Sequence, residues 1–358
     1  MTFGRQNPHV PDLGERLARR TLELVDIPSE SRQEAAAMEY VREQLPLEPI
    51  RATEDVLFAV AGPPEAELVV LAGHLDTVPA QGNLPGRLDG NAVVGLGASD
   101  MKGGLAVMLE LAARAGEFAI RLGFLFFTRE ELAATESPVP EFLAGCDEAR
   151  EAALVIVLEP TDNELHAGCL GNLGARLTFH GTSAHSARPW TGENAIHKAA
   201  ARLAPLATAE PVDVDVDGLV FREVTSVVAI EGGIADNVVP ARCVARLNYR
   251  YAPGTSAAEA EARIREVAGD AEVELLGNSP PAPVVVDRPL VRRLRATGDF
   301  AVRPKQAWTP VAQFAEAGLD AINLGPGLTR YAHKADERVP VAELVRTYDA
   351  LARFADTV

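Results

Sequence analysis

A histidine and an aspartate stand two residues apart at the end of an apolar run, in the segment Leu71-Ala-Gly-His-Leu-Asp-Thr-Val-Pro79. If this run is a strand, His74 and Asp76 share one face, because side chains along a strand alternate with a period of two. A carboxylate beside an imidazole can accept one ring N–H and leave the other nitrogen for a metal ion. Taken alone, the pair could equally be a structural hydrogen bond, so its meaning depends on the rest of the chain.

Other segments also place a metal-capable side chain at the end of an expected strand or in an adjacent loop. Besides His74, these side chains are Asp100, Glu130, Glu131, Glu159 and His333. Ligands bind at the carboxyl ends of strands in open α/β sheets, so these positions can converge. Imidazoles and carboxylates without thiolates suit zinc, with cobalt or manganese as substitutes.

Glu130 and Glu131 are adjacent in the sequence, so the local backbone decides whether both side chains can reach one site. On a regular strand they would face opposite ways. They can serve one site only if the chain turns after Phe127, where the apolar pattern stops. The alternative is a solvated acidic loop.

Several other chemistries are excluded by the motifs. The run Gly95-Leu-Gly-Ala-Ser-Asp100 begins like a dinucleotide fingerprint but has an aspartate in place of the third glycine. No P-loop, G-x-S-x-G elbow or HExxH helix occurs. The three cysteines, Cys146, Cys169 and Cys243, show no CxxC spacing, so we expect small buried side chains rather than disulfides or zinc thiolates.

The net charge of the chain indicates which kinds of binding partner to expect. Acidic residues outnumber basic ones by 51 to 34, a net charge of −17, which argues against nucleic acid or an anionic membrane as partner. Residues 1–20 lack the apolar core of a leader, and no apolar run approaches a membrane span. We therefore expect a cytoplasmic enzyme that acts on a small molecule.

The hydrophobic pattern predicts the elements that position these residues. Strands are expected at residues 56–60, 68–72, 120–127, 154–158 and 321–324, and helices at 13–25, 103–115 and from 341 onward. The nearly continuous apolar strands suit a sheet covered on both faces, so the fold class is α/β with a mostly parallel, helix-covered sheet.

The pattern changes after Gly171. Strands with one polar face are expected at 174–180, 225–231 and 241–251, with helices at 193–206 and 257–267. These are the first five elements of the β-α-β-β-α-β order of a ferredoxin-like α+β module, and a Pro-rich return linker is expected at 277–283. We therefore expect a catalytic domain at 1–172 and 282–358 with a module inserted at 173–281. No internal repeat is present.

Together these segments resemble the M20 family of co-catalytic zinc peptidases and aminoacylases. The resemblance is carried by GHLDTVP, SDMKGG, TREE, LEP and AHKADE, in family order and with family-like separations. It covers nearly the whole chain, because GTSAHSARPWTGENAI and GGIADNVVP in the inserted module are also similar to family motifs.

The resemblance implies two zinc ions per subunit. Asp100 would bridge them, His74 and Glu159 would complete one site, and Glu131 and His333 the other. Three carboxylates and one hydroxide neutralise two divalent cations, so a sixth ionised ligand is not needed. This supports leaving Glu130 free for proton transfer.

The resemblance also implies catalytic roles. Glu130 would be the general base that takes a proton from the attacking water and passes it to the leaving amine. Asp76 would support His74. His185 would reach the active site of a partner subunit and stabilise the oxyanion, which implies a homodimer built through the inserted module. The alternative for His185 is a surface histidine in a polar loop.

Candidates for binding a small anionic N-acyl amino acid are Arg188, Asn237, Arg250 and Gly325. A guanidinium such as that of Arg250 recognises carboxylates in bidentate fashion. Asn237 could instead serve only turn chemistry, and Arg188 could simply be exposed. Gly325-Pro-Gly327 could present backbone N–H groups to an anion or form only a tight turn.

Within the family, SARPWTGENAI, NYRYAP and AHKADERV are most similar to the succinyl-diaminopimelate desuccinylases. The resemblance thus implies cleavage of N-succinyl-LL-2,6-diaminopimelate, a step of lysine and cell-wall synthesis. The alternatives are another M20 deacylase or peptidase, such as an acetylornithine deacetylase or a carboxypeptidase, and a non-catalytic binding protein of the same fold.

The chain departs from the family pattern at a few positions. Pro310 and Gln313 stand where many relatives have an aspartate and an arginine, and Arg129 where many have an acidic or small residue. These departures bear on substrate identity more than on the metal centre. The resemblance further implies a cis peptide between Asp100 and Met101.

Overall fold

The computed structural model describes residues 12–357, and the chain divides into two compact units. The first unit contains the chain up to His166, the segment Val285–Val302 and the residues from Ala317 onward. The second unit contains Ala167–Val284 and Arg303–Glu316. The expectation for residues 1–20 falls largely on residues 1–11, which lie outside the described part.

The segment Arg303–Glu316 corrects our expectation that residues 282–358 all belong to the catalytic domain. Trp308 Nε1–H donates to the carbonyl oxygen of Pro280 (3.2 Å), and the Cys169 thiol lies 3.9 Å from the carbonyl oxygen of Thr309. These contacts lie within the second unit. Apolar periodicity gave no sign of them, because they involve single polar atoms of an irregular segment.

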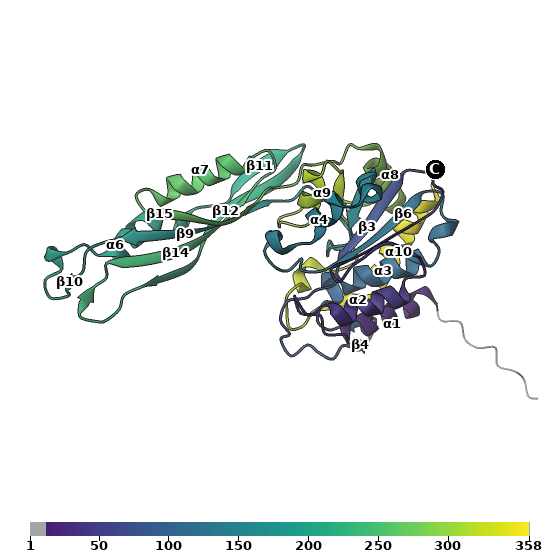
Figure 1. The fold of residues 1–358 in the computed structure, drawn as a ribbon, viewed down its shortest axis with the longest axis horizontal. Helices are drawn as coiled ribbons and strands as arrows, with labels where there is room; N and C mark the ends of the chain where they lie inside the picture. The colour runs from purple at the N-terminus through teal and green to yellow at the C-terminus, as the bar shows by residue number, and fades with distance from the viewer. Residues whose placement is uncertain (1–11, 358) are drawn as a thin grey trace, which may run out of the picture. The chain divides into compact units, whose positions relative to one another are not determined.

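A single large sheet organises the first unit (Figure 1). Its strand order is β1 (Pro49–Ala52), β2 (Val56–Ala61), β6 (Arg121–Phe127), β3 (Leu68–His74), β7 (Leu154–Val157), β17 (Ala321–Asn323), β8 (Leu165–Ala167) and β16 (Val302–Pro304). The pairs β6–β3, β3–β7 and β7–β17 are parallel, whereas β1–β2 and β2–β6 are antiparallel. The expectation of a mostly parallel sheet is confirmed.

Helices cover both faces of this sheet. They are α1 (Leu13–Val25), α2 (Ala35–Gln44), α3 (Gly103–Ala112), α4 (Val139–Ala144), α5 (Asp147–Arg150), α8 (Pro289–Gly298) and α10 (Val341–Asp356). The helix α3 lies so close to β3 that a Cβ on Gly73 would come within 2.7 Å of Leu105. On the opposite face, Phe142 of α4 packs edge-on against Phe58 of β2, with ring centroids 5.3 Å apart. Burial on both faces explains why these strands read as continuous apolar runs.

A small antiparallel sheet of β18 (Arg338–Pro340), β5 (Ala92–Val94) and β4 (Arg87–Asp89) completes the first unit. The helix α1 begins at residue 13, as predicted, because Asp12 and Glu15 form a reciprocal capping box. Among the described residues, no helix is both long enough and apolar enough to cross a bilayer.

The second unit is an antiparallel sheet in the order β11 (Val212–Val216), β12 (Leu219–Gly232), β14 (Arg242–Tyr251), β9 (Gly171–His180) and β15 (Glu272–Ser279). The helices α6 (Ala195–Leu203) and α7 (Ala257–Ala268) pack on one face, against alternate residues of β9 and β14. Without β11, the strand order and helix positions are those of the expected ferredoxin-like module. The helix α9 (Val311–Glu316) and the short pair β10 (Ala184–His185) and β13 (Val238–Val239) also belong to this unit.

Two details of this unit differ from the expectation. The predicted strand at 225–231 is twice as long, and its hairpin partner β11 was missed. The signal for it was present, since Val and Asp alternate over 212–216 and are followed by Asp217-Gly218, both with positive φ. The expected linker at 277–283 begins too early, because β15 continues to Ser279.

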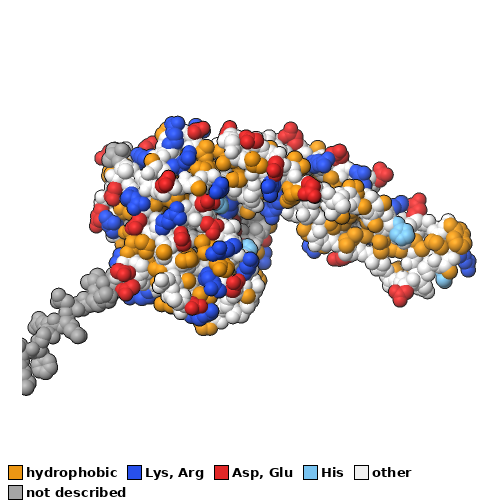
Figure 2. Space-filling view, turned by 180° about the vertical axis from the view of Figure 1, so that it is seen from behind, with side chains coloured by type: hydrophobic (Ala, Val, Ile, Leu, Met, Phe, Trp, Pro, Cys, Tyr) orange, Lys and Arg blue, Asp and Glu red, His pale blue; other side chains and the backbone are white. Residues whose placement is uncertain are grey.

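On the face shown in Figure 2, acidic and basic side chains are interspersed over both units. That face of the described residues shows no continuous basic surface of the kind that binds nucleic acid.

Candidate metal centre

The carboxyl ends of three neighbouring strands carry predicted site residues. β3 ends at His74, β6 is followed by Glu130 and Glu131, and β7 is followed by Glu159. These strands are parallel neighbours, so their ends share one edge of the sheet. The structure therefore brings these side chains to the edge where open α/β sheets bind ligands.

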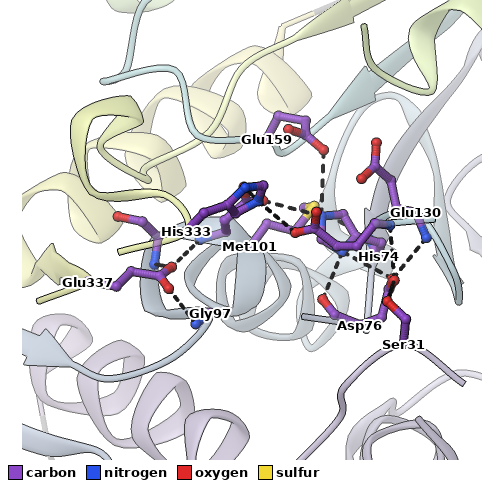
Figure 3. A network of polar contacts seen from close by, with 12 residues as sticks. Ser31, His74, Asp76, Gly97, Met101, Glu130, Glu159, His333 and Glu337 are labelled. Atoms are coloured by element: carbon purple, nitrogen blue, oxygen red, sulfur yellow. Dashed lines mark hydrogen bonds and ion pairs between the residues drawn. The ribbon is translucent and has the colours of Figure 1, made fainter. Parts of the chain in front are cut away.

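Asp100 contacts both His74 and His333. The two histidines are labelled in Figure 3. Its Oδ1 is 3.3 Å from His74 Nε2, and its Oδ2 is 3.4 Å from His333 Nε2. One carboxylate thus presents a different oxygen to each imidazole. This is the arrangement required of a ligand shared by two ions.

Each histidine also faces a second carboxylate. His74 Nε2 is 3.6 Å from Glu159 Oε1, and His333 Nε2 is 2.9 Å from Glu131 Oε1. Ligand atoms of His74, Asp100 and Glu131 all lie within 4.8 Å of one another. The five expected ligands therefore form one cluster, which lies entirely in the first unit.

Contacts of Nδ1, the ring nitrogen of His74 that does not face Asp100, orient its ring. His74 Nδ1 lies 3.0 Å from the backbone oxygen of Asp76 and 3.4 Å from its Oδ1. The nearer acceptor is therefore the backbone carbonyl rather than the carboxylate that we expected. Either contact places the ring N–H on Nδ1 and leaves Nε2 directed at Asp100.

The carboxylate of Asp76 has a further task that sequence reasoning missed. Its Oδ1 accepts the N–H of Glu130 (2.9 Å), and its Oδ2 accepts the N–H of Glu131 (3.0 Å) and the hydroxyl of Ser31 (2.8 Å). Burial opposes ionisation, but the hydrogen bonds from His74 and these N–H groups lower the pKa of Asp76. Asp76 therefore fixes both the first histidine and the paired glutamates.

The turn that the paired glutamates require occurs at Arg129, which has a φ of 60°. Thr128 Oγ1 donates to Asp55 Oδ1 (3.0 Å), and Arg129 Nη2 pairs with Asp55 Oδ2 (2.5 Å). The N–H of Arg129 donates to Glu34 Oε1 (3.2 Å). The unusual arginine therefore directs its charge to Asp55 and supports the turn.

Glu130 is partly buried among other acids. Burial and the neighbouring charge of Glu159 raise the pKa of Glu130 well above its usual value. Its carboxylate lies with the imidazole of His74 and the carboxylate of Glu159 in a second group of potential ligand atoms. A carboxyl group with a raised pKa is suited to accept and return a proton near neutral pH.

The imidazoles and the shared carboxylate are strongly coupled. Burial opposes protonation of His74, yet hydrogen bonds to Asp100 and Asp76 raise its pKa well above the usual value. Hydrogen bonds to Asp100 and Glu131 raise the pKa of His333 to about 11. Burial of Asp100 is outweighed by its hydrogen bonds from the two histidines, which lower its pKa.

Asp100 belongs to an irregular turn, Ala98–Lys102, that leads into α3. The expected cis peptide between Asp100 and Met101 is present. The turn is fastened by Glu337, whose carboxylate accepts backbone N–H groups from it, and burial raises the pKa of Glu337 to about 7. Glu337 is the last residue of the AHKADE segment, but nothing in the sequence predicts this contact.

Gly325 does not offer a free N–H to an anion, which corrects one of our expectations. Its N–H donates to Thr161 Oγ1 (3.0 Å). A Cβ at Gly325 would lie 2.3 Å from the carbonyl oxygen of Leu158 and 2.4 Å from that of Glu159. The glycine is therefore needed for close approach to the segment that carries a metal-capable carboxylate.

The remaining predicted residues belong to the second unit. His185 on β10 is exposed, and its Nδ1 accepts the N–H of Ala187 (3.1 Å). The neighbouring Ser186 N–H donates to the carbonyl oxygen of Asn237 (2.9 Å), and the Arg188 N–H donates to that of His185 (2.8 Å). The structure therefore gathers three predicted residues, His185, Arg188 and Asn237, at the β10–β13 end of this unit.

Arg250 is not part of that group. It lies near the end of β14, where its Nε donates to Asn248 Oδ1 (2.9 Å). Burial lowers the pKa of its guanidinium. Pro310 and Gln313 lie at the start of α9, where the Gln313 N–H donates to the Pro310 carbonyl oxygen (2.9 Å), and both side chains are buried.

A cavity of about 600 Å³ in the second unit lies between α6 and the end of α7. Two of its polar side chains are paired, His180 with Glu272 (2.9 Å) and Lys198 with Glu193 (2.6 Å). Neither of the potential ligand groups found among the described residues lines this cavity.

The donor set fits a pair of divalent metal ions. Two imidazoles and three carboxylates converge, with one carboxylate between the two histidines. Nitrogen and oxygen donors of this kind suit zinc, cobalt or manganese. The three cysteines are buried free thiols and are not among these ligand groups of the described residues.

Comparison with known proteins finds a matching family and several similar sequences. The model of peptidase family M20/M25/M40 matches residues 70–357. A Mycobacterium tuberculosis protein, provisionally named a succinyl-diaminopimelate desuccinylase, is 39% identical over 341 residues, covering 93% of this chain and 96% of its own. The succinyl-diaminopimelate desuccinylase of Corynebacterium glutamicum is 35% identical over 349 residues, covering 93% and 94%.

Solved structures have the same fold. The aminopeptidase PepT of Bacillus cereus aligns with a TM-score of 0.79 at 20% identity, covering 96% of this chain and 98% of its own. The M20 metallo-carboxypeptidase Sso-CP2 of Sulfolobus solfataricus aligns with a TM-score of 0.75 at 17% identity, covering 95% and 98%. At these identities the likeness concerns the fold alone.

Proposed function

Since this chain belongs to peptidase family M20/M25/M40 and is a metal-dependent amide hydrolase, we propose that it cleaves N-succinyl-LL-2,6-diaminopimelate to succinate and LL-diaminopimelate. The reaction is a step of lysine and cell-wall synthesis. The observation that carries the proposal is the 35–39% identity to relatives of that name over 93% of the chain, which includes both units.

We propose zinc as the metal, with two ions per subunit, and cobalt or manganese as substitutes. Asp100 would be shared, His74 and Glu159 would hold one ion, and His333 and Glu131 the other. When bound, such ions polarise an amide carbonyl and lower the pKa of water. The ligand distances support this assignment, because each imidazole already faces Asp100 and one further carboxylate.

Glu130 would take the proton of the attacking water and return it to the leaving amine. Its position supports this role, since it lies beside the ligand atoms of His74 and Glu159 without being needed as a sixth ligand. Its raised pKa makes the protonated form accessible between the two transfers. Asp76 holds the backbone of Glu130 in place and orients His74.

We also propose a homodimer through the second unit, in which His185 of a second copy stabilises the developing oxyanion. Its exposure at the β10–β13 end leaves it accessible for such a contact. Arg188, Asn237 and Arg250 are proposed to bind substrate carboxylates, since guanidinium and amide groups pair well with them.

A turnover panel tests the substrate. Metal-depleted protein reconstituted with Zn²⁺ is assayed on succinyl-diaminopimelate, N-acetylornithine and simple dipeptides. We expect the succinyl substrate to have the highest kcat/KM and activity to require added metal. A preference for N-acetylornithine or for dipeptides would replace the proposed substrate with another M20 activity, and metal-independent turnover would contradict the proposed centre.

A further inference from the structure

Glu337 is a buried acid that is not a metal-ligand candidate, yet its carboxylate is fully engaged. Its Oε2 accepts the N–H of Gly97 (2.8 Å), and its Oε1 accepts the N–H groups of Ser99 (3.0 Å) and Asp100 (2.9 Å). Its side chain is only 1% exposed. Figure 3 shows Glu337 directed at this backbone rather than into the ligand cluster.

The backbone that Glu337 holds is the turn that presents Asp100. Gly97 has a φ of 78°, and a Cβ there would lie 2.9 Å from Thr77 Cγ2, so few residues could replace it. Ser99 Oγ donates to the carbonyl oxygen of Arg338 (2.7 Å), next to Glu337. The turn is therefore tied to the 337–338 segment by both backbone and side-chain hydrogen bonds.

The same C-terminal segment presents His333, four residues before Glu337. The Glu337 N–H donates to the Lys334 carbonyl oxygen (3.1 Å), which closes the turn between them. His333 itself has a φ of 61°, and its carbonyl oxygen accepts a hydrogen bond from Gln81 Nε2 (2.9 Å). One side chain thus connects the segment of the shared carboxylate with the segment of the second histidine.

We propose that Glu337 is a positioning residue that sets the spacing between Asp100 and His333 and thereby the affinity of the ion bound by His333 and Glu131. The inference rests on the dinuclear centre of the proposed function. His74 lies on β3 and does not depend on Glu337, whereas the exposed turn of His333 does. Loss of the hydrogen bonds that Glu337 accepts should therefore weaken binding of the ion held by His333 and Glu131. Binding of the ion held by His74 and Glu159 should change less.

The test variant is Glu337→Gln, which keeps the size of the side chain. Its amide NH₂ would face at least one backbone N–H that the carboxylate accepts, so that hydrogen bond is lost. The matched control is Glu110→Gln on α3 in the same unit. Glu110 is 9% exposed and pairs with Arg16 (3.1 Å) and Arg20 (3.2 Å), so it is a buried, doubly paired acid away from the ligand turns.

Metal-free protein is titrated with Zn²⁺ by calorimetry and with Co²⁺ by its visible absorption. We expect the wild-type protein and Glu110→Gln to bind two ions per subunit. For Glu337→Gln we expect the first affinity within about threefold of wild type and the second reduced about 10–100-fold, the range typical of residues that orient metal ligands. The cobalt bands of the second ion should weaken accordingly.

Wild-type affinity for both ions in Glu337→Gln would overturn the inference, as would an equal loss of the second ion in Glu110→Gln. A wild-type protein that binds fewer than two ions would instead contradict the proposed dinuclear centre, so the two failures are distinguishable. Should Glu337→Gln not fold, Glu337→Asp keeps the charge but shortens the reach. It should weaken the second ion to a smaller extent, and unchanged binding would again overturn the inference.

Discussion

At the scale of single residues, the role proposed for Glu130 places two requirements on this side chain. As the proposed general base, it must lie close to the ligand cluster and remain free to exchange a proton. Its backbone is fixed by Asp76, while its side chain lies among acids that raise its pKa. Proton transfer and metal binding are therefore assigned to adjacent residues of one turn.

Replacement of Glu130 by Gln should separate these two functions. We expect the metal content to stay at the wild-type value while kcat falls by about 10²–10⁴-fold, the usual contribution of a general base. Metal analysis and steady-state kinetics on the same preparation measure both. Glu39→Gln, an exposed acid on α2, serves as the control. Unchanged kcat in Glu130→Gln would refute the assigned role.

Metal binding should release protons from His74 and His333. The pKa values of His333 and His74 are both raised above the usual value, which favours protonated imidazoles without metal, and a bound ion must displace those protons. Affinity should therefore fall as the pH is lowered. Calorimetric titration in two buffers of different ionisation enthalpy measures the protons released.

His180→Gln is the matched control for proton release, because His180 is an exposed histidine paired with Glu272 in the second unit. It should release as many protons as wild type. Identical binding heats in the two buffers for the wild-type protein would contradict the expected displacement.

Three of the five candidate ligands could be predicted from the sequence because they lie at or shortly after the end of an apolar strand. His74 ends β3, Glu131 comes after β6 and Glu159 comes after β7. The hydrogen bonds of Asp76 and Glu337 to backbone N–H groups could not be predicted. A carboxylate that accepts backbone amides needs no particular side chain opposite it, so no residue pattern marks the contact.

At the scale of elements, the Gly325-Pro-Gly327 segment runs against the backbone of two ligand-bearing segments. A Cβ at Gly325 would meet the carbonyl oxygen of Glu159 at 2.4 Å, and one at Gly327 would meet that of Ser99 at 2.1 Å. These distances are too short for any side chain. Packing therefore requires glycine at both positions.

Gly325→Ala should displace the segment that carries Glu159. We expect a loss of about 1–3 kcal/mol in the free energy of unfolding, as for other overpacked sites, together with weaker metal binding. Gly116→Ala is the control, because a Cβ there meets nothing within 4 Å and its φ is not positive. Denaturant unfolding and metal titration measure both effects. Equal stability of the two variants would contradict the close approach.

Elements with one clear periodicity were predicted nearly to the residue. α1 and β2 are examples, since one apolar stripe or one apolar run determines each. β11 was missed although Val and Asp alternate along it, because its residues are exposed or half-buried and form no apolar run like those of the core strands. The assignment of Arg303–Glu316 failed for a different reason, since only tertiary contacts place it.

At the scale of the whole molecule, the proposal that His185 acts on a second copy can be tested by complementation. Glu130→Gln and His185→Ala chains should each be nearly inactive as homodimers. In a mixed dimer, one site would combine an intact Glu130 with an intact His185 from the other chain. Random mixing should then restore about a quarter of wild-type activity, because half of the dimers contain one competent site of two.

The mixture is prepared by co-expression of two differently tagged chains and compared with each variant alone. A mixture of two Glu130→Gln preparations with different tags is the control and should remain inactive. The absence of restored activity, with mixed dimers demonstrated by tandem purification, would place His185 in the site of its own chain or outside catalysis.

The grouping of Arg303–Glu316 with Ala167–Val284 has a practical consequence for engineering this family of enzymes. The polypeptide passes between the two units four times. The second unit is therefore not a single continuous insertion that could be exchanged at one pair of junctions. A chimaera that transplants only the longer stretch would leave Trp308 and Thr309 facing a foreign surface. Specificity transplants between homologues should therefore carry both stretches together.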